Sequence, residues 1–95
     1  MLFTHAISVE QIDLMKRAIF FEHKKVKRGK YRVWRNYFTT PDSEKQWDEL
    51  VSAGYAMKQD FPHGIGDNPK MYFVSKVGMR ALERILDIKI EEDEE

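Results

Sequence analysis

Apolar residues recur at helical spacing near the start of the chain. Ile12, Met15 and Ile19 fall on one face when three or four residues separate each from the next. Ser8 precedes this face, and Gln11 follows three residues later, which is the spacing of a capping box at a helix start. The pattern predicts a first helix from Ser8 to about residue 22 or 23.

The next segment, residues 23–40, lacks helix signals and is rich in aromatic and β-branched residues. Tyr31 and Val33 favour an extended chain. We therefore expect a strand over about residues 30–34, followed by an irregular or short helical turn through Phe38.

A second helix is predicted with defined ends. Thr40 is a good capping residue and Pro41 suits the first helical position. Ser43 with Gln46 offers an alternative capping box. Gly54 marks the end, because a left-handed residue closes a helix at low cost when it is glycine.

The rest of the chain predicts a hairpin followed by a third helix. Residues 55–61 alternate between two faces, residues 62–69 are dense in turn formers, and residues 70–74 are again strand-like. Ser75 can cap the final helix. Residues 87–90 are expected to continue that helix in frayed form.

Aromatic residues mark the expected core. Trp34, Trp47 and Phe38 are predicted at its centre, with Trp34 half exposed as the alternative. Phe20 and Phe21, near the end of the first helix, are expected to turn inward.

Composition narrows the class of protein. Ninety-five residues with 42% hydrophobic content suit one folded domain, placed at residues 1–90, with an acidic disordered tail at residues 91–95. The absence of cysteine excludes disulfides and thiolate metal sites. No apolar run approaches the roughly 20 residues that span a bilayer, and the start lacks the features of a signal peptide. These features predict a cytoplasmic protein without membrane contact.

The net charge is zero, yet the charges are segregated: seven basic residues and no acidic one lie between Lys24 and Arg35. Basic charge attracts phosphate, and interleaved aromatic rings can stack on bases, so DNA or RNA is the expected partner. Six or seven phosphate contacts would weaken binding about a thousandfold between about 50 and 200 mM salt. The candidate nucleic-acid-binding residues are Lys24, Lys25, Lys27, Arg28, Lys30, Tyr31, Arg32, Trp34, Arg35 and, beside the predicted turn, Lys70.

Two structural interpretations of the basic segment compete with nucleic-acid binding. The lysines can belong to a solvated edge strand, where charge discourages aggregation. Alternatively, the acidic tail can dock onto the basic segment within the same molecule.

Signals for catalysis or metal binding are weak. His5, His23 and His63 are scattered over different predicted elements, which disfavours a zinc site. The Gly-rich turn at residues 64–69 lacks the Gly-Lys-Ser/Thr of a phosphate loop. Asn36 could contact adenine or satisfy a backbone bend. The sequence predicts a non-enzymatic protein with no cofactor, no metal and no evident small-molecule substrate.

Two segments carry a family resemblance. The phrase LVSAGYAMK, a turn, and then MYFVSKVGMRAL resemble the closing half of winged-helix regulators. With WRNYFTT added, residues 8–86 are similar to a group of small uncharacterised phage and prophage proteins. That resemblance implies a bacterial host and a winged-helix-like fold, but no mechanism. The positions that match the winged-helix regulators are Leu50, Val51, Gly54, Tyr72, Val74, Ser75 and Gly78.

The chain departs from DNA-reading winged helices at the helix that would enter the groove. That helix carries Asp42, Glu44, Asp48 and Glu49 against only Lys45, so it would repel phosphates. There is also little room for the helix that should precede it.

The sequence thus predicts an α+β, winged-helix-like fold of order α-β-α-β-β-α with a small three-stranded antiparallel sheet. The predicted function is a phage-type accessory module that contacts nucleic acid through its basic strand. The alternative is a protein-interaction or homodimerisation module.

Overall fold

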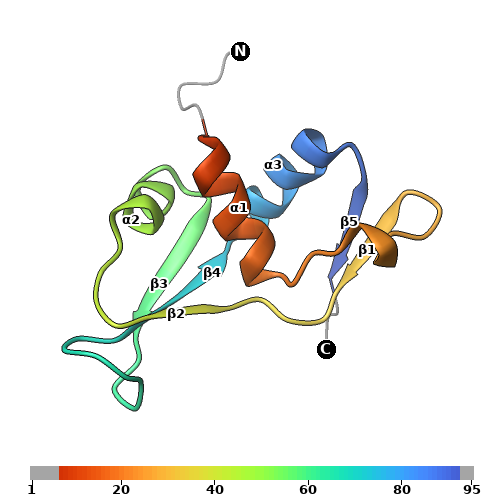
Figure 1. Cartoon of the computed structure of the whole chain (residues 1–95). Coiled ribbons are helices and arrows are strands. Elements are labelled where there is room, and N and C mark those ends of the chain that lie inside the picture. Colours follow the sequence, from red (N-terminus) through yellow and green to blue (C-terminus); the bar gives the residue numbers. More distant parts are fainter. Residues whose placement is uncertain (1–6, 93–95) are drawn as a thin grey trace.

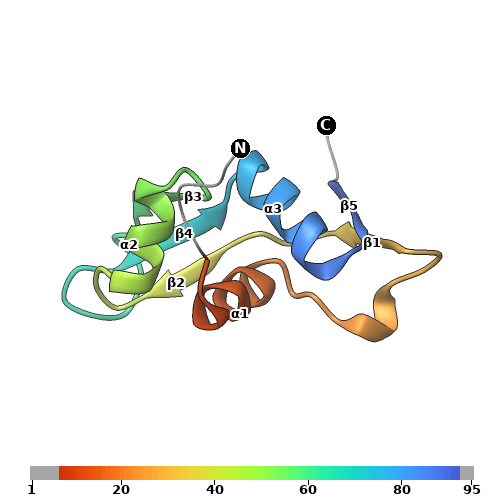
Figure 2. The ribbon, with the colours of Figure 1, turned by 90° about the horizontal axis from the view of Figure 1, so that it is seen from above.

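The computed structural model describes residues 7–92, and its long axis measures 42 Å. It is an α+β structure with one three-stranded antiparallel sheet and one parallel strand pair, which lie toward opposite ends of the molecule (Figures 1 and 2). The elements, in chain order, are α1 (Val9–Ala18), the single 3-10 turn η1 (His23–Lys25), β1 (Lys30–Val33), β2 (Phe38–Thr40), α2 (Lys45–Ser52), β3 (Ala56–Asp60), β4 (Lys70–Val74), α3 (Lys76–Leu86) and β5 (Lys89–Glu92).

The three-stranded sheet confirms the predicted fold class but not the identity of its third strand. The sheet has the order β2-β4-β3, and β2 places Phe38 opposite Tyr72. The predicted strand at residues 30–34 is instead β1, which pairs in parallel with β5. Residues 38–40, predicted as part of an irregular turn, take the place in the sheet. Just before β2, the Asn36 side chain forms hydrogen bonds of 2.9 Å with both the N–H and the C=O of Val74, which fixes the start of β2 beside the end of β4.

The first helix begins as predicted and ends earlier. Ser8 and Gln11 form the capping box, each side chain accepting from the other's backbone N–H at 3.0 Å. Phe20 then adopts φ 55°, which takes the chain out of the helix. The Tyr31 hydroxyl lies 2.8 Å from the carbonyl oxygen of Ile19 and 2.6 Å from that of Phe20, so its single hydrogen is shared between two carbonyl acceptors at the helix end. The predicted extension to residue 22 or 23 is therefore wrong.

The second helix starts later than predicted. Thr40 belongs to β2 opposite Lys70, so it is not the cap. Glu44, rather than Ser43, caps α2, accepting the backbone N–H of Gln46 at 2.9 Å. No helix lies between β2 and α2, so the partner helix of a helix-turn-helix is absent from residues 41–44.

The chain beyond the third helix corrects a further expectation. Ser75 caps α3 as predicted, accepting from Gly78 N–H at 3.0 Å. Asp87, with φ 56°, ends the helix, so a frayed continuation is wrong. Residues 89–92 form β5, so Glu91 and Glu92 belong to the fold and not to a disordered tail. The rest of the expected tail, residues 93–95, lies outside the described chain.

An aromatic stack forms the core between α2 and the three-stranded sheet. Trp47 is fully buried, stacked on Tyr72 with ring centroids 5.2 Å apart, and Phe38 lies 5.6 Å away. Trp34 is 56% exposed, so the prediction that places it at the core centre is wrong, and the half-exposed alternative describes it. Ile90 of β5 is 2% exposed and belongs to the same buried cluster.

Candidate nucleic-acid interface

The basic segment folds into a tight hairpin at one end of the molecule (Figure 1). Lys27 and Lys30 exchange two backbone hydrogen bonds, of 2.8 and 2.9 Å. Between them Arg28 and Gly29 have φ values of 54° and 76°, the positive pair of a type I′ turn. We call residues 24–32 the basic hairpin. Its turn projects Lys27, Arg28 and Lys30 into solvent.

Alternation along β1 separates core from surface residues. Tyr31 and Val33 point inward and are buried, whereas Lys30 and Arg32 are exposed. Trp34 follows in the same alternation and is also exposed. Tyr31 therefore cannot stack on a base, but Trp34 remains accessible.

The cations of the basic hairpin differ in their partners. Lys25 lies 3.7 Å from the carboxylate of Glu22, and its ammonium is 5.6 Å from the Trp34 ring centroid. Three other exposed cations have no ion pair or hydrogen bond from their side chains to any residue in the range 7–92. They are Lys24, Lys27 and Arg28.

Strand β5 brings acidic residues alongside β1. The parallel register sets Glu91 beside Arg32, and the Glu91 carboxylate lies 3.8 Å from the ammonium of Lys30. Glu92 turns instead to Arg80, at 3.3 Å. The intramolecular docking that competed with nucleic-acid binding thus occurs along the strand, where Glu91 reaches Lys30 and the Lys89 N–H donates to the Gly29 carbonyl at 2.8 Å. No carboxylate among residues 7–92 pairs with Lys24, Lys27 or Arg28.

Two predicted binding residues have other surroundings. The guanidinium carbon of Arg35 lies 3.9 Å from the Phe20 ring centroid and 4.1 Å from that of Tyr37, so rings cover both faces of the group. Lys70 lies on β4 at the opposite end of the molecule (Figures 1 and 2), where its ammonium binds Asp60. That hydrogen bond and the charge of Lys70 lower the pKa of the Asp60 carboxyl. Lys70 is therefore not part of this interface.

Sequence reasoning missed two exposed aromatic residues. Phe20 and Tyr37 are each 39% exposed, and Phe20 meets Trp34 edge to face with centroids 5.3 Å apart. Phe21, its neighbour, packs inward against Tyr31 at 5.0 Å. Two adjacent aromatic residues at a helix end point in different directions, so only one of them can face the core. The adjacency of Phe20 and Phe21 in the sequence could therefore have indicated that one ring is exposed.

Other candidate sites have structural roles. The side-chain amide of Asn36 donates to the carbonyl of Val74 and accepts from its N–H, so it is not free to contact a base. The Gly-rich turn folds back on the sheet, since Asn68 N–H donates to the carbonyl of Pro41 at 3.1 Å. Within residues 7–92, no group of three His, Cys, Asp or Glu side chains could hold a metal ion. His5 lies outside that range.

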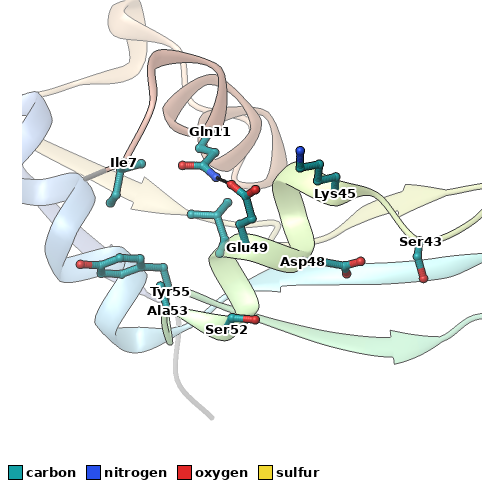
Figure 3. A pocket seen from close by; sticks show the side chains of 10 residues that line it. Ile7, Gln11, Ser43, Lys45, Asp48, Glu49, Ser52, Ala53 and Tyr55 are labelled. Carbon is teal, nitrogen blue, oxygen red and sulfur yellow. Dashed lines mark hydrogen bonds between the residues drawn. The ribbon is translucent and has the colours of Figure 1, made fainter. Parts of the chain in front are cut away.

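A cavity of about 620 Å³ lies between α1 and α2 at the opposite end (Figure 3). The Gln11 amide crosses between the helices, donating to Glu49 at 3.1 Å and to the carbonyl of Gln46 at 3.3 Å. This buried amide is fully committed to holding the helices together.

Ser43 and Lys58, near this cavity, have the composition of a serine–lysine pair, with the ammonium 3.0 Å from the hydroxyl. The Lys58 ammonium also lies 3.0 Å from Asp48. This hydrogen bond to Asp48 raises the pKa of Lys58 despite some desolvation. Lys58 consequently stays protonated and cannot act as a base toward Ser43.

Comparisons with known proteins add no identity: no protein-family model matches the chain, and no curated protein or solved structure is significantly similar to it. In the part of the chain that the structure describes, no helix is both long and apolar enough to cross a membrane.

Proposed function

We propose that the protein is a small binding module that contacts nucleic acid through its basic hairpin. The observation that carries this proposal is a set of three exposed cations at and beside a tight turn, Lys24, Lys27 and Arg28, which pair with no residue in the range 7–92. An ammonium or guanidinium held in solvent without a partner gains most by meeting a phosphate. The resemblance to phage and prophage proteins favours an accessory role in a bacterial cell.

The acidic residues restrict how a polyanion can approach. Asp48 and Glu49 lie on α2, at the end opposite the basic hairpin (Figures 1 and 2), and Glu91 lies on β5 beside β1. A polyanion would therefore avoid α2 and meet the hairpin away from β5. This orientation differs from that of a winged helix, whose corresponding helix enters the groove.

The three cations without a partner among residues 7–92 support a proposal of about three phosphate contacts, fewer than the six or seven expected from the sequence. Three contacts predict that affinity falls about 40-fold between about 50 and 200 mM salt, rather than a thousandfold. Fluorescence anisotropy with a labelled oligonucleotide at the two salt concentrations would measure this slope.

Charge reversal supplies the matched test. Lys27→Glu should weaken binding and flatten the salt dependence, and Lys27→Glu with Arg28→Glu should do so further, by tenfold or more at low salt (about 1.4 kcal/mol). Lys45→Glu makes the same charge change on exposed α2 and should leave affinity near the wild-type value. Equal affinity of the hairpin double variant and the wild-type protein would refute the proposal.

A protein-interaction role is supported by a different observation. The parallel sheet consists of β1 and β5 alone, so each strand has one edge without a strand partner among residues 7–92. Such edges accept an added strand from another chain. If the open edge of β1 or of β5 pairs with a second copy, light scattering after size exclusion, over a range of protein concentrations, would show a dimer.

A further inference from the structure

We propose that Trp34 is a stacking surface for an unpaired base, so that the protein selects single-stranded over duplex nucleic acid. This inference rests on the proposed function, because the basic hairpin supplies the phosphate contacts. It adds the class of nucleic acid and the residue that distinguishes it.

The argument starts from the unusual exposure of Trp34. A tryptophan that keeps 56% of its surface in solvent leaves a large apolar area unburied. Trp34 follows directly after β1, on the same side as Lys30 and Arg32. The ring also lies 5.6 Å from the ammonium of Lys25, which is next to Lys24 in the basic hairpin. A chain whose phosphates meet the hairpin at Lys24 would therefore bring a base to the indole.

The neighbours of Trp34 hold it in place. Phe20 meets the indole edge to face at 5.3 Å, and Phe20 itself packs on the guanidinium of Arg35 at 3.9 Å. Tyr37 covers the other face of that guanidinium at 4.1 Å. An indole supported from behind loses little conformational freedom when a ligand stacks on it.

Phe20 occupies this position at a conformational cost. Its φ of 55° lies in the left-handed region, which a bulky L-residue seldom adopts. The strained backbone directs the ring outward to Trp34, while Phe21 takes the inward position. Strain of this kind concentrates where a fold presents a functional surface.

Lys25 connects the indole to the phosphate contacts. Its ammonium lies 5.6 Å from the Trp34 ring centroid and 3.7 Å from Glu22. A base that stacks on the indole displaces this ammonium from the ring. The displaced charge is then available to the phosphate next to that base.

Base pairing decides the selectivity. In a duplex both faces of each base are covered by its neighbours, so a base can reach Trp34 only after it leaves the stack, which costs free energy. An unpaired base stacks without that cost, and every base has a ring face to offer.

The two tryptophans make the proposal measurable. Trp47 is fully buried and serves as an internal reference, so only Trp34 should report a stacked base. We would titrate the protein with oligothymidylate of about 12 nucleotides, with its RNA counterpart, and with a duplex of equal length. The single strands should quench tryptophan emission, and the duplex should not.

Substitution then separates stacking from charge. Trp34→Leu should abolish the quenching and weaken single-strand binding about tenfold or more, while duplex binding stays unchanged. Trp34→Phe should restore most of the affinity without the fluorescence signal. Met57→Ala removes a side chain of similar exposure, 54%, on distant β3 and should have no effect.

The outcomes distinguish this inference from the proposed function. If single strand and duplex bind equally, with a salt slope that Lys27→Glu flattens, the hairpin binds nucleic acid and the stacking role is refuted. Unchanged single-strand affinity in Trp34→Leu would refute it as well. If no nucleic acid binds at low salt, both proposals fail.

Discussion

The two ends of the molecule differ in how their polar and aromatic groups are satisfied. At the α2 end, Trp47 is buried, and Lys58, Asp48 and the Tyr72 hydroxyl bond to one another. At the hairpin end, Trp34 is exposed, and Lys24, Lys27 and Arg28 have no side-chain partner among residues 7–92. Trp47 is buried and stabilises the fold, whereas Trp34 is exposed and available to a ligand.

This difference shows why motif matching alone would misplace the function. The residues that resemble winged-helix regulators lie mainly at the α2 end, where they form the core and the turns. The exposed cations without a partner among residues 7–92 lie on the hairpin, outside that motif, whereas the unpartnered indole N–H of Trp47 at the α2 end is buried. A side chain whose bonding capacity is met inside the protein has little left for a partner.

The largest expected effect separates the two tryptophans. Trp47→Ala should lower the free energy of unfolding by about 3–5 kcal/mol, because it empties a fully packed position. Trp34→Ala should change it by less than about 1 kcal/mol, as for most exposed sites. Urea unfolding followed by circular dichroism measures both, and similar losses would contradict the contrast.

A second comparison tests whether β5 belongs to the folded domain. Ile90→Ala should cost about 2–5 kcal/mol of unfolding free energy because the side chain is buried opposite Tyr31. Ile85 on α3 is 43% exposed, so Ile85→Ala is the matched control and should cost less. A smaller loss for Ile90→Ala than for Ile85→Ala would place β5 outside the core.

The smallest expected effect is on the free energy of unfolding at acidic pH, and it involves Asp48 on α2. Desolvation raises the pKa of Asp48, but hydrogen bonds from Tyr72 and Lys58 outweigh it, so the net pKa is lowered. A lowered folded-state pKa stabilises the fold above the ordinary carboxyl pKa of about 3.9. That stability is lost as pH falls through the lowered value.

Because the Asp48 side chain is 40% exposed, the contribution should stay below about 1 kcal/mol. Asp48→Asn should flatten the dependence of unfolding free energy on pH across that acidic range. Tyr72→Phe, which removes one donor, should flatten it in part. An unchanged slope in both variants would show that these hydrogen bonds do not couple to folding.

The elements that were predicted correctly carry their signals locally. The capping box at Ser8 and the cap at Ser75 need only residues three positions away, and both form. Strand β4 and helix α3 follow their hydrophobic periods from end to end. The run of basic charge was likewise visible in the sequence, but its folding into a hairpin was not predicted.

Predictions were wrong where the local sequence was equally compatible with two structures. Thr40 can cap a helix or pair in a strand, and its place opposite Lys70 decided for the strand. Phe20 and Phe21 have the same hydrophobicity, and the turn at Phe20 decided which ring faces the core. Neither outcome is encoded within a few residues.

By itself, the sequence determined the α+β class, the hairpin and final helix, and the position of the basic segment, because these depend on neighbouring residues and periodicity. Tertiary structure alone decided that residues 89–92 pair with β1, that Phe38 enters the three-stranded sheet, and that Trp34 stays exposed. The reason is that strand pairing and burial are set by segments far apart along the chain, 34 residues for Phe38 and Tyr72 and 59 for Lys30 and Lys89. Such segments compete for the same edges and the same core.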